Sequence, residues 1–130
     1  MIPVTSAMLA AFFGILGAVL TLRVILSRVR LKVVAGDGGN RDMAKVIRAH
    51  ANFTEQVPLA LVLFTLAELC GAPRVPLYLL GALLVLARCL SAWGLSSAAG
   101  LSTGRQAGAG MTLAYMVATA GLLVYSVLGR

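Results

Sequence analysis

The sequence predicts an all-α integral membrane protein, a bundle of four helices that forms a single domain over residues 1–130. Of its residues, 60% are hydrophobic and only 12% are charged, whereas a soluble domain is about half apolar and about a quarter charged. Mean hydropathy is +0.96. Four apolar runs, each near the roughly 20 residues that cross a hydrocarbon core, occupy 3–26, 51–70, 75–95 and 107–128. Because lipid offers no partner to an unpaired backbone group, each run is expected to be a helix.

A charged linker with a glycine-rich turn separates the first two helices. The chain begins "MIPVTSAMLAAFFGILGAVLTLRVILSRVR", and its charges follow the apolar run, whereas those of a signal peptide precede it. A transmembrane helix is therefore predicted over about 3–30. The turn "GDGGN" interrupts the pattern, and the second helix is predicted over about 42–70.

Two shorter linkers bound the remaining helices. The stretch "GAPRVP" is a tight turn between prolines, and the third helix is predicted over about 74–96. The linker "SSAAGLSTGRQAG" consists mostly of small residues and leads into the fourth helix, predicted over about 105–128. Within it, Gly104 and Gly108 form a GxxxG pattern, which permits two helices to approach closely.

The net charge of +7 comes largely from the linkers. The first linker holds Arg28, Arg30, Lys32, Arg41 and Lys45. The second holds Arg74 and the third Arg105. Because cytoplasmic loops carry an excess of Lys and Arg, the first and third linkers are expected in the cytoplasm. No long basic face with interleaved aromatic residues occurs, so a nucleic-acid partner is not expected.

Cysteine and histidine do not form a metal-ligand pattern. Cys70, Cys89 and His50 lack partners at a suitable spacing, so no metal is expected. Both cysteines are expected to be packing residues.

Polar residues recur at one depth of the predicted bundle. Arg48, Asn52 and Glu55 follow the i, i+4, i+7 spacing of one helix face. At about 1.5 Å per residue, Glu55 lies roughly 10 to 14 Å inside the membrane, and Arg88 of the third helix lies at about 12 Å from the same surface. This face must point into the bundle or toward a partner chain, because lipid does not tolerate ionisable groups.

Further polar residues stand near helix ends. Arg105 opens the fourth helix, and the first helix closes with Arg23, Arg28 and Arg30. Pro58 lies just beyond the polar face and lacks a backbone N–H, so it is expected to kink the second helix. Glu68, at the far end of that helix, is expected to be solvated or paired with Arg74.

Three interpretations of this layer remain open. Glu55 could form a buried ion pair with Arg88 or Arg48 that pins the bundle. The layer could instead line an arginine-rich pocket that opens to the cytoplasm and binds an anionic ligand, because arginine holds carboxylates with two hydrogen bonds. A small transporter with Glu55 as a proton-coupled carboxylate is less favoured, since such carboxylates are not usually surrounded by arginines.

The stretch "RAHANFTEQVP" resembles the MAPEG family, the membrane-associated proteins in eicosanoid and glutathione metabolism. Its pattern Arg-x-x-x-Asn-x-x-Glu-x-x-Pro is matched by Arg48, Asn52, Glu55 and Pro58. The turn "GDGGN" and the stretch "LARCLSAWGL", which contains Arg88, look like those of bacterial members. The resemblance covers essentially the whole chain. It implies a homotrimer in the bacterial inner membrane, with glutathione as cosubstrate at the subunit interfaces, in the cytoplasmic half.

The resemblance also implies roles for individual residues. Arg48 and Asn52 would hold the polar backbone of glutathione, and Glu55 its amino group. Arg30, or alternatively Arg28 or Arg23, would come from the first helix, and Arg88 would support the site from the third helix. Arg105 resembles the arginine that stabilises the glutathione thiolate.

The implied activity is that of a glutathione transferase or peroxidase. A thiol with a pKa of about 8.5 is mostly protonated at neutral pH, and a nearby guanidinium favours the nucleophilic thiolate. The thiolate would attack a lipophilic small molecule that arrives among the membrane lipids. The alternative is a non-catalytic membrane protein that binds a lipid or a small anion in the same arginine-rich pocket.

One departure concerns the specialised eicosanoid enzymes of the family. They carry a histidine or tyrosine on the third helix and a serine or tyrosine soon after the arginine of the fourth. Here the corresponding segments contain Ser91 and Leu95, and Gln106 and Ala109. A specialised eicosanoid synthase is therefore not expected.

Overall fold

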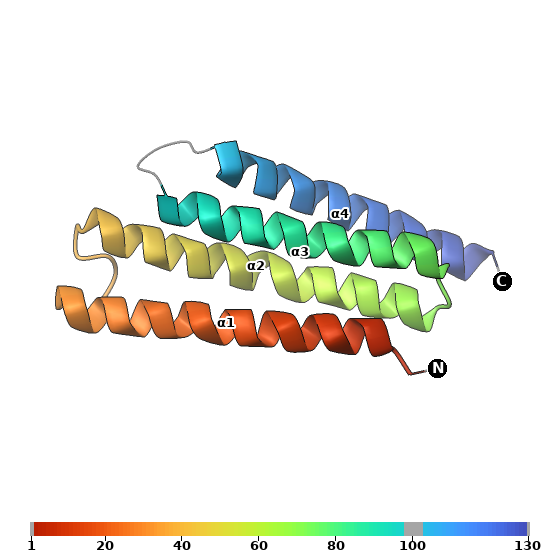
Figure 1. The fold of residues 1–130 in the computed structure, drawn as a ribbon, viewed down its shortest axis with the longest axis horizontal. Coiled ribbons are helices and arrows are strands. Elements are labelled where there is room, and N and C mark those ends of the chain that lie inside the picture. The colour runs from red at the N-terminus through yellow and green to blue at the C-terminus, as the bar shows by residue number, and fades with distance from the viewer. Residues whose placement is uncertain (1, 98–102, 130) are drawn as a thin grey trace.

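In the part of the chain that it describes, the computed structural model contains four helices, and the predicted all-α bundle is confirmed. It describes the backbone of residues 2–97 and 103–129, and the side chains of this part except 92–97 and 103–106. The helices are α1 (Val4–Leu31), α2 (Arg41–Leu69), α3 (Arg74–Ser97) and α4 (Thr103–Leu128). They lie side by side along the long axis of the molecule (Figure 1).

Three helices in the described part of the chain are long and apolar enough to cross a membrane. They comprise Val4–Leu31, Arg74–Ser91 and Ala107–Leu128. The remaining helix, α2, is also long enough, but its first half carries Arg41, Asp42, Lys45 and Arg48. The chain is therefore a multi-pass membrane protein whose one less apolar helix carries the polar motif.

The core lies where α2, α3 and α4 pack on one another, while α1 packs mainly on α2. Phe64, Leu84 and Tyr115 are fully buried there. The Tyr115 hydroxyl donates to the backbone oxygen of Ala60 at 3.0 Å, so even the largest polar group of the core is satisfied. Pro58 lies inside α2, which runs as one continuous helix through it, and the expected kink stays a prediction.

The close approach of α3 and α4 requires a glycine. A Cβ atom added at Gly108 would lie 2.1 Å from the Ser91 Oγ and 2.9 Å from the backbone oxygen of Ala87. Because real Cβ atoms do not come so near, no larger residue fits without separating the helices. The expected close approach of helices is therefore confirmed at Gly108. The surroundings of Gly104, the other glycine of the GxxxG pattern, are outside the part of the structure that is described.

Glu68 ties the beginning of α1 to the end of α2. Its carboxylate accepts hydrogen bonds from the backbone N–H groups of Thr5 at 3.0 Å and Ser6 at 2.7 Å, and from the Ser6 hydroxyl. The first N–H groups of a helix lack partners and attract negative charge, and Pro3 provides no side-chain cap. The alternative of a Glu68 pair with Arg74 was therefore wrong for the part of the chain that the structure describes, because a helix terminus close in space supplies the donors.

The linker between α1 and α2 turns through three glycines with positive φ angles. Gly36, Gly38 and Gly39 have φ angles of +58°, +59° and +72°, a region that side chains disfavour. The Asn40 side chain then caps α2 by accepting hydrogen bonds from backbone N–H groups in the first turn of the helix. Arg28 donates to the backbone oxygen of Gly36 at 3.0 Å, which holds the turn against the end of α1.

Gly108→Ala should destabilise the protein by about 1–3 kcal/mol, since the added methyl group overpacks the contact with α3. Thermal unfolding in detergent measures the effect. Gly110→Ala is the matched control, because a Cβ there meets nothing within 4 Å. Equal loss of stability in the two variants would contradict the close approach.

Candidate functional site

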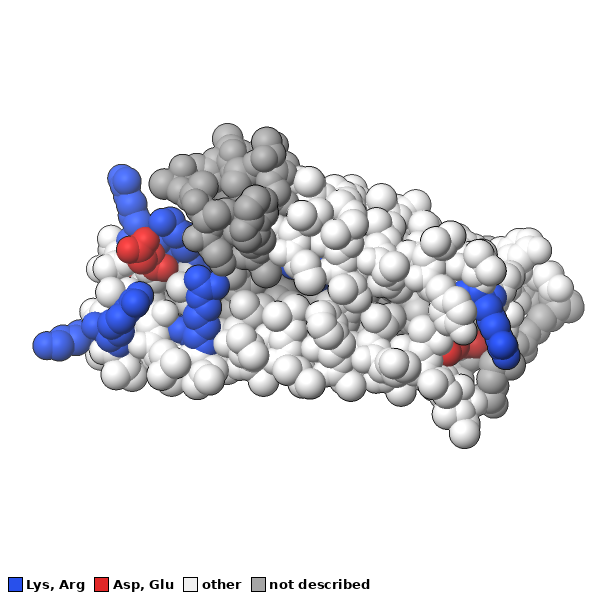
Figure 2. All heavy atoms as spheres, in the orientation of Figure 1, with Lys and Arg blue, Asp and Glu red and all other residues white. Residues whose placement is uncertain are grey.

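Cationic side chains gather at one end of the bundle, where α1 ends and α2 begins (Figure 2). The described cations of these segments are Arg23, Arg28, Arg30, Lys32, Arg41, Lys45 and Arg48. The carboxylates on the same segments are fewer, and one of them, Asp42, pairs with Lys45 at 3.0 Å. This end of the bundle therefore carries an excess of positive charge. The end of α2 and the start of α3, which contain Glu68 and Arg74, lie at the opposite end of the bundle (Figure 1).

A buried guanidinium joins three helices just inside this end. Arg88 of α3 is only 3% exposed. Its Nη1 donates to the Asn52 Oδ1 on α2 at 3.0 Å. Its Nη2 lies 3.1 Å from the Ser91 Oγ, 2.5 Å from the Thr112 Oγ1 and 3.5 Å from the backbone oxygen of Gly108. A buried charge is tolerated only when it is hydrogen bonded in this way.

Two buried polar atoms near this network have no hydrogen-bond partner within the described part of the chain. They are the Arg88 Nε and the Gln56 Oε1. A cavity of about 10 Å³, lined by Arg88, Asn52, Phe53 and Ser91 among others, lies beside the guanidinium. This volume is close to what a single water molecule needs.

The expected buried ion pair of Glu55 is not present. Glu55 is exposed and makes no hydrogen bond or ion pair with any residue that the structure describes. Arg88 uses Asn52 as its partner on α2 instead, and Arg48 is exposed as well. The interpretation that Glu55 pins the bundle through Arg88 or Arg48 was therefore wrong: the neutral amide, not the carboxylate, faces the core.

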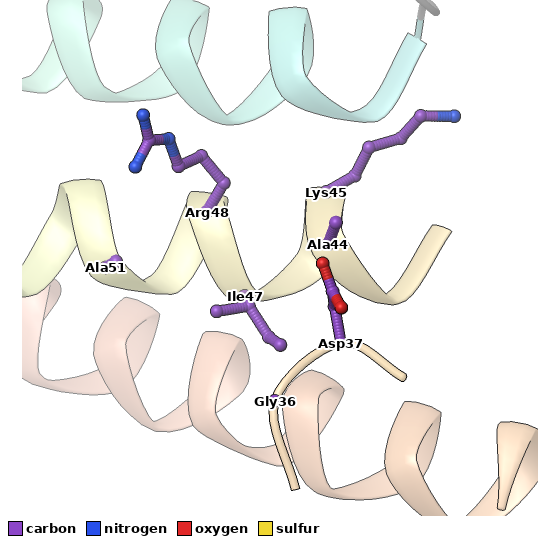
Figure 3. A pocket seen from close by; sticks show the side chains of 7 residues that line it. All are labelled: Gly36, Asp37, Ala44, Lys45, Ile47, Arg48 and Ala51. Carbon is purple, nitrogen blue, oxygen red and sulfur yellow. The ribbon is translucent and has the colours of Figure 1, made fainter. Parts of the chain in front are cut away.

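An open cavity of about 660 Å³ lies against the outer face of α2. Its charged lining residues are Asp37, Lys45 and Arg48, and its remaining lining residues are Gly36, Ala44, Ile47 and Ala51. In the close-up, Lys45 and Arg48 extend toward α3, while Asp37 reaches from the linker over α2 (Figure 3). The cavity therefore has cations on one side and a carboxylate on the other.

Asp37 was not anticipated from the sequence as part of this cavity. It precedes Arg48 by eleven positions and lies on a different element. The signal that could have revealed it is the turn "GDGGN" itself, because its glycines fold the linker back onto the start of α2.

The remaining candidate residues do not meet in this cavity. Glu55 lies one turn beyond Ala51 on the same face of α2. Arg30 lies instead in a second groove, together with Arg23 and Ser27. The backbone of Arg105 belongs to the first turn of α4, but its side chain lies outside the described residues.

Comparison with known proteins adds to this geometry. The sequence profile of the MAPEG family matches residues 6–128. The chain is also similar to the inner membrane protein YecN of Escherichia coli (strain K12), with 31% identity over 91 residues, 67% of this chain and 70% of the relative. The protein of the same name from Escherichia coli O6:H1 matches with the same identity and coverage.

Arg88→Lys should destabilise the protein by about 3 kcal/mol, because one ammonium cannot replace the planar fork and leaves buried acceptors unpaired. Thermal unfolding in detergent measures this loss. The control Arg41→Lys alters an exposed residue and should change stability by less than about 0.5 kcal/mol. A wild-type melting temperature for Arg88→Lys would show that the three-helix contact is unimportant.

Proposed function

The chain belongs to the MAPEG family of membrane proteins in glutathione and eicosanoid metabolism, and from this premise we propose that it activates a glutathione thiolate against lipophilic electrophiles. It would act as a membrane-bound glutathione transferase or peroxidase. The observation that carries the proposal is the polar motif of α2, in which Arg88 fixes Asn52 from within while Arg48 and Glu55 face outward.

The cavity beside Arg48 suits a small anionic ligand. Its volume of about 660 Å³ falls within the roughly 300–1,000 Å³ of small-molecule sites. Arg48 can bind a carboxylate through two parallel hydrogen bonds, and Lys45 adds a second positive charge. Glutathione, with two carboxylates and one ammonium group, carries the complementary net charge.

Asn52 offers donors to such a ligand. A guanidinium has no hydrogen-bond acceptor, so the Asn52 side chain must turn its oxygen toward Arg88. Its amide N–H groups are thereby left to bind a peptide carbonyl or a carboxylate. Arg88 acts here through Asn52, as a positioning residue rather than as a ligand contact.

The outward position of Arg48 and Glu55 supports a site that a second copy completes. Glu55 would take the ammonium group of the γ-glutamyl residue. Arg30 lies in a different groove from Arg48, so it would reach the ligand only from a neighbouring protomer. We therefore include a homotrimer with its sites at the subunit boundaries in the proposal.

Arg105 is the proposed catalytic residue. It stands in the first turn of α4, one turn before Gly108, whose backbone lies at the Arg88 guanidinium. A guanidinium near the sulfur would favour the thiolate, and the thiol proton would pass to water. The sulfur would then bond to the electrophilic carbon while the leaving group departs with its electron pair.

The proposed setting is the bacterial inner membrane, with the basic end of the bundle toward the cytoplasm. The relative YecN is an inner membrane protein, and the excess of Lys and Arg at this end follows the rule for cytoplasmic loops. Glutathione would enter from the cytoplasm, and the lipophilic substrate from the bilayer.

Calorimetry with glutathione and detergent-purified protein, combined with ultraviolet absorbance of the thiolate, tests the proposal. Saturable binding with a thiolate signal is expected. Arg105→Ala should retain binding but lose the thiolate signal and turnover of a model electrophile. No binding at millimolar glutathione, or wild-type turnover in Arg105→Ala, would refute the proposal; lipid binding alone would favour a non-catalytic protein.

Arg48→Ala and Glu55→Gln should each weaken glutathione binding by about tenfold or more, because each removes a charge-assisted hydrogen bond. The same titration measures both variants. Lys32→Ala removes an exposed cation that does not line the Arg48 cavity and should bind like the wild type. Equal weakening in all three variants would indicate a general charge effect instead of a defined site.

A further inference from the structure

A second groove runs along α1 at the basic end of the bundle. It measures about 500 Å³ and is separate from the cavity that Arg48 lines. Its polar side consists of Arg23, Ser27 and Arg30, at the i, i+4, i+7 spacing of one helix face. The apolar residues that line it are Val19, Leu22, Leu26 and, on α2, Val46.

The groove crosses from the interface into the hydrocarbon region. The 28 residues of α1 measure about 42 Å, more than the roughly 30 Å of a hydrocarbon core. The last turn, which contains Arg30, therefore reaches the headgroup layer. Arg23 lies two turns deeper, about 10 Å along the axis, and Val19 lies one further turn toward the bilayer centre.

Along the groove, cationic, polar and apolar side chains follow one another in the order of the phosphate, ester and acyl groups of a phospholipid. The cation of Arg30 stands at the depth of a phosphate, and Arg23 and Ser27 stand below it at the depth of the glycerol ester region. The side chains of Val19, Leu22 and Leu26 are each more than half exposed and offer an apolar wall to an acyl chain. A soluble anion could bind the arginines, but it has no apolar group to cover this wall.

We propose that this α1 groove binds a phospholipid with an anionic headgroup, with its phosphate at Arg30, its glycerol esters at Arg23 and Ser27, and one acyl chain along Leu26, Leu22 and Val19. Basic pockets between transmembrane helices hold anionic headgroups through the same chemistry. The lining of the groove shares no residue with the Arg48 cavity, and Arg30 is the one residue that this proposal takes from the proposed glutathione site.

Lipid retention tests the groove. The full-length protein is reconstituted with equal phosphatidylglycerol and phosphatidylcholine, extracted in mild detergent, and its bound lipid is counted by native mass spectrometry. The wild type should retain phosphatidylglycerol in preference to phosphatidylcholine. The double variant Arg23→Gln/Arg30→Gln should retain about tenfold less phosphatidylglycerol, because the cations beside the phosphate and beside the ester region are both lost.

The matched control is Lys32→Gln/Arg41→Gln, which removes two exposed cations from the same end of the bundle but outside the groove. It should change retention by less than about twofold, as expected of charges remote from a bound headgroup. Equal losses in the two double variants would overturn the proposal in favour of a general charge effect. Should the arginine double variant not fold, Arg30→Gln alone, in the exposed last turn, must still lower retention.

Competition separates the possible sources of the phosphate. Glycerol phosphate, which has no acyl chain, should not displace the retained lipid at millimolar concentration, and complete displacement would reduce the groove to a small-anion site. Glutathione titrations on the same variants distinguish this proposal from the previous one. Loss of glutathione binding with unchanged lipid retention in Arg30→Gln would assign Arg30 to the thiol site and overturn the lipid groove.

Discussion

The burial of one guanidinium, that of Arg88, sets the arrangement of the basic end of this protein. In a membrane, a buried cation must find all its hydrogen-bond partners within the protein. The two terminal nitrogens of Arg88 find them on α2 through Asn52 and on α4 through Thr112 and the backbone of Gly108, whereas its Nε has no partner among the described residues. This requirement fixes the separation of α3 and α4, and it explains why the contact between them is made by a glycine. The helix α4, which carries Arg105 in its first turn, is thereby held at a fixed distance from the polar motif of α2.

The same requirement divides the polar residues of α2 into two groups. Asn52 turns inward because it alone can accept from Arg88 without adding a second buried charge. Arg48 and Glu55, which are charged, remain exposed on the outer side. Within a bilayer, the charged groups on this face of a single protomer would lack polar partners, since lipid does not solvate them. A polar ligand and a neighbouring copy would together satisfy them, and this is the physical link between the fold and the proposed thiol chemistry.

Much of the bundle could be predicted from the sequence, because hydropathy and turn residues act locally. The stretch "GDGGN" directly precedes the start of α2 at Arg41, and "GAPRVP" contains the start of α3 at Arg74. The spacing of Arg48, Asn52 and Glu55 identified a polar face, but periodicity does not say which edge of that face turns toward the core. The Glu55 ion pair failed for this reason. The Glu68 contact with α1 and the place of Asp37 in the wall of the Arg48 cavity join segments far apart in the chain or on different elements, and no local pattern encodes them.

Hydrogen bonds hold the hairpin of α1 and α2 at both of its ends. Glu68 holds the first turn of α1, Arg28 holds the linker at the other end, and between them Thr21 and His50 lie within hydrogen-bond distance, at 3.1 Å. Sliding one helix past the other by a single turn, about 5.4 Å, would break the Glu68 contacts and the Thr21–His50 contact. The hairpin therefore behaves as a rigid rod of fixed length. In a bilayer thinner than its apolar length, it must respond by tilting as a unit, which would carry both grooves of the basic end together relative to the membrane surface.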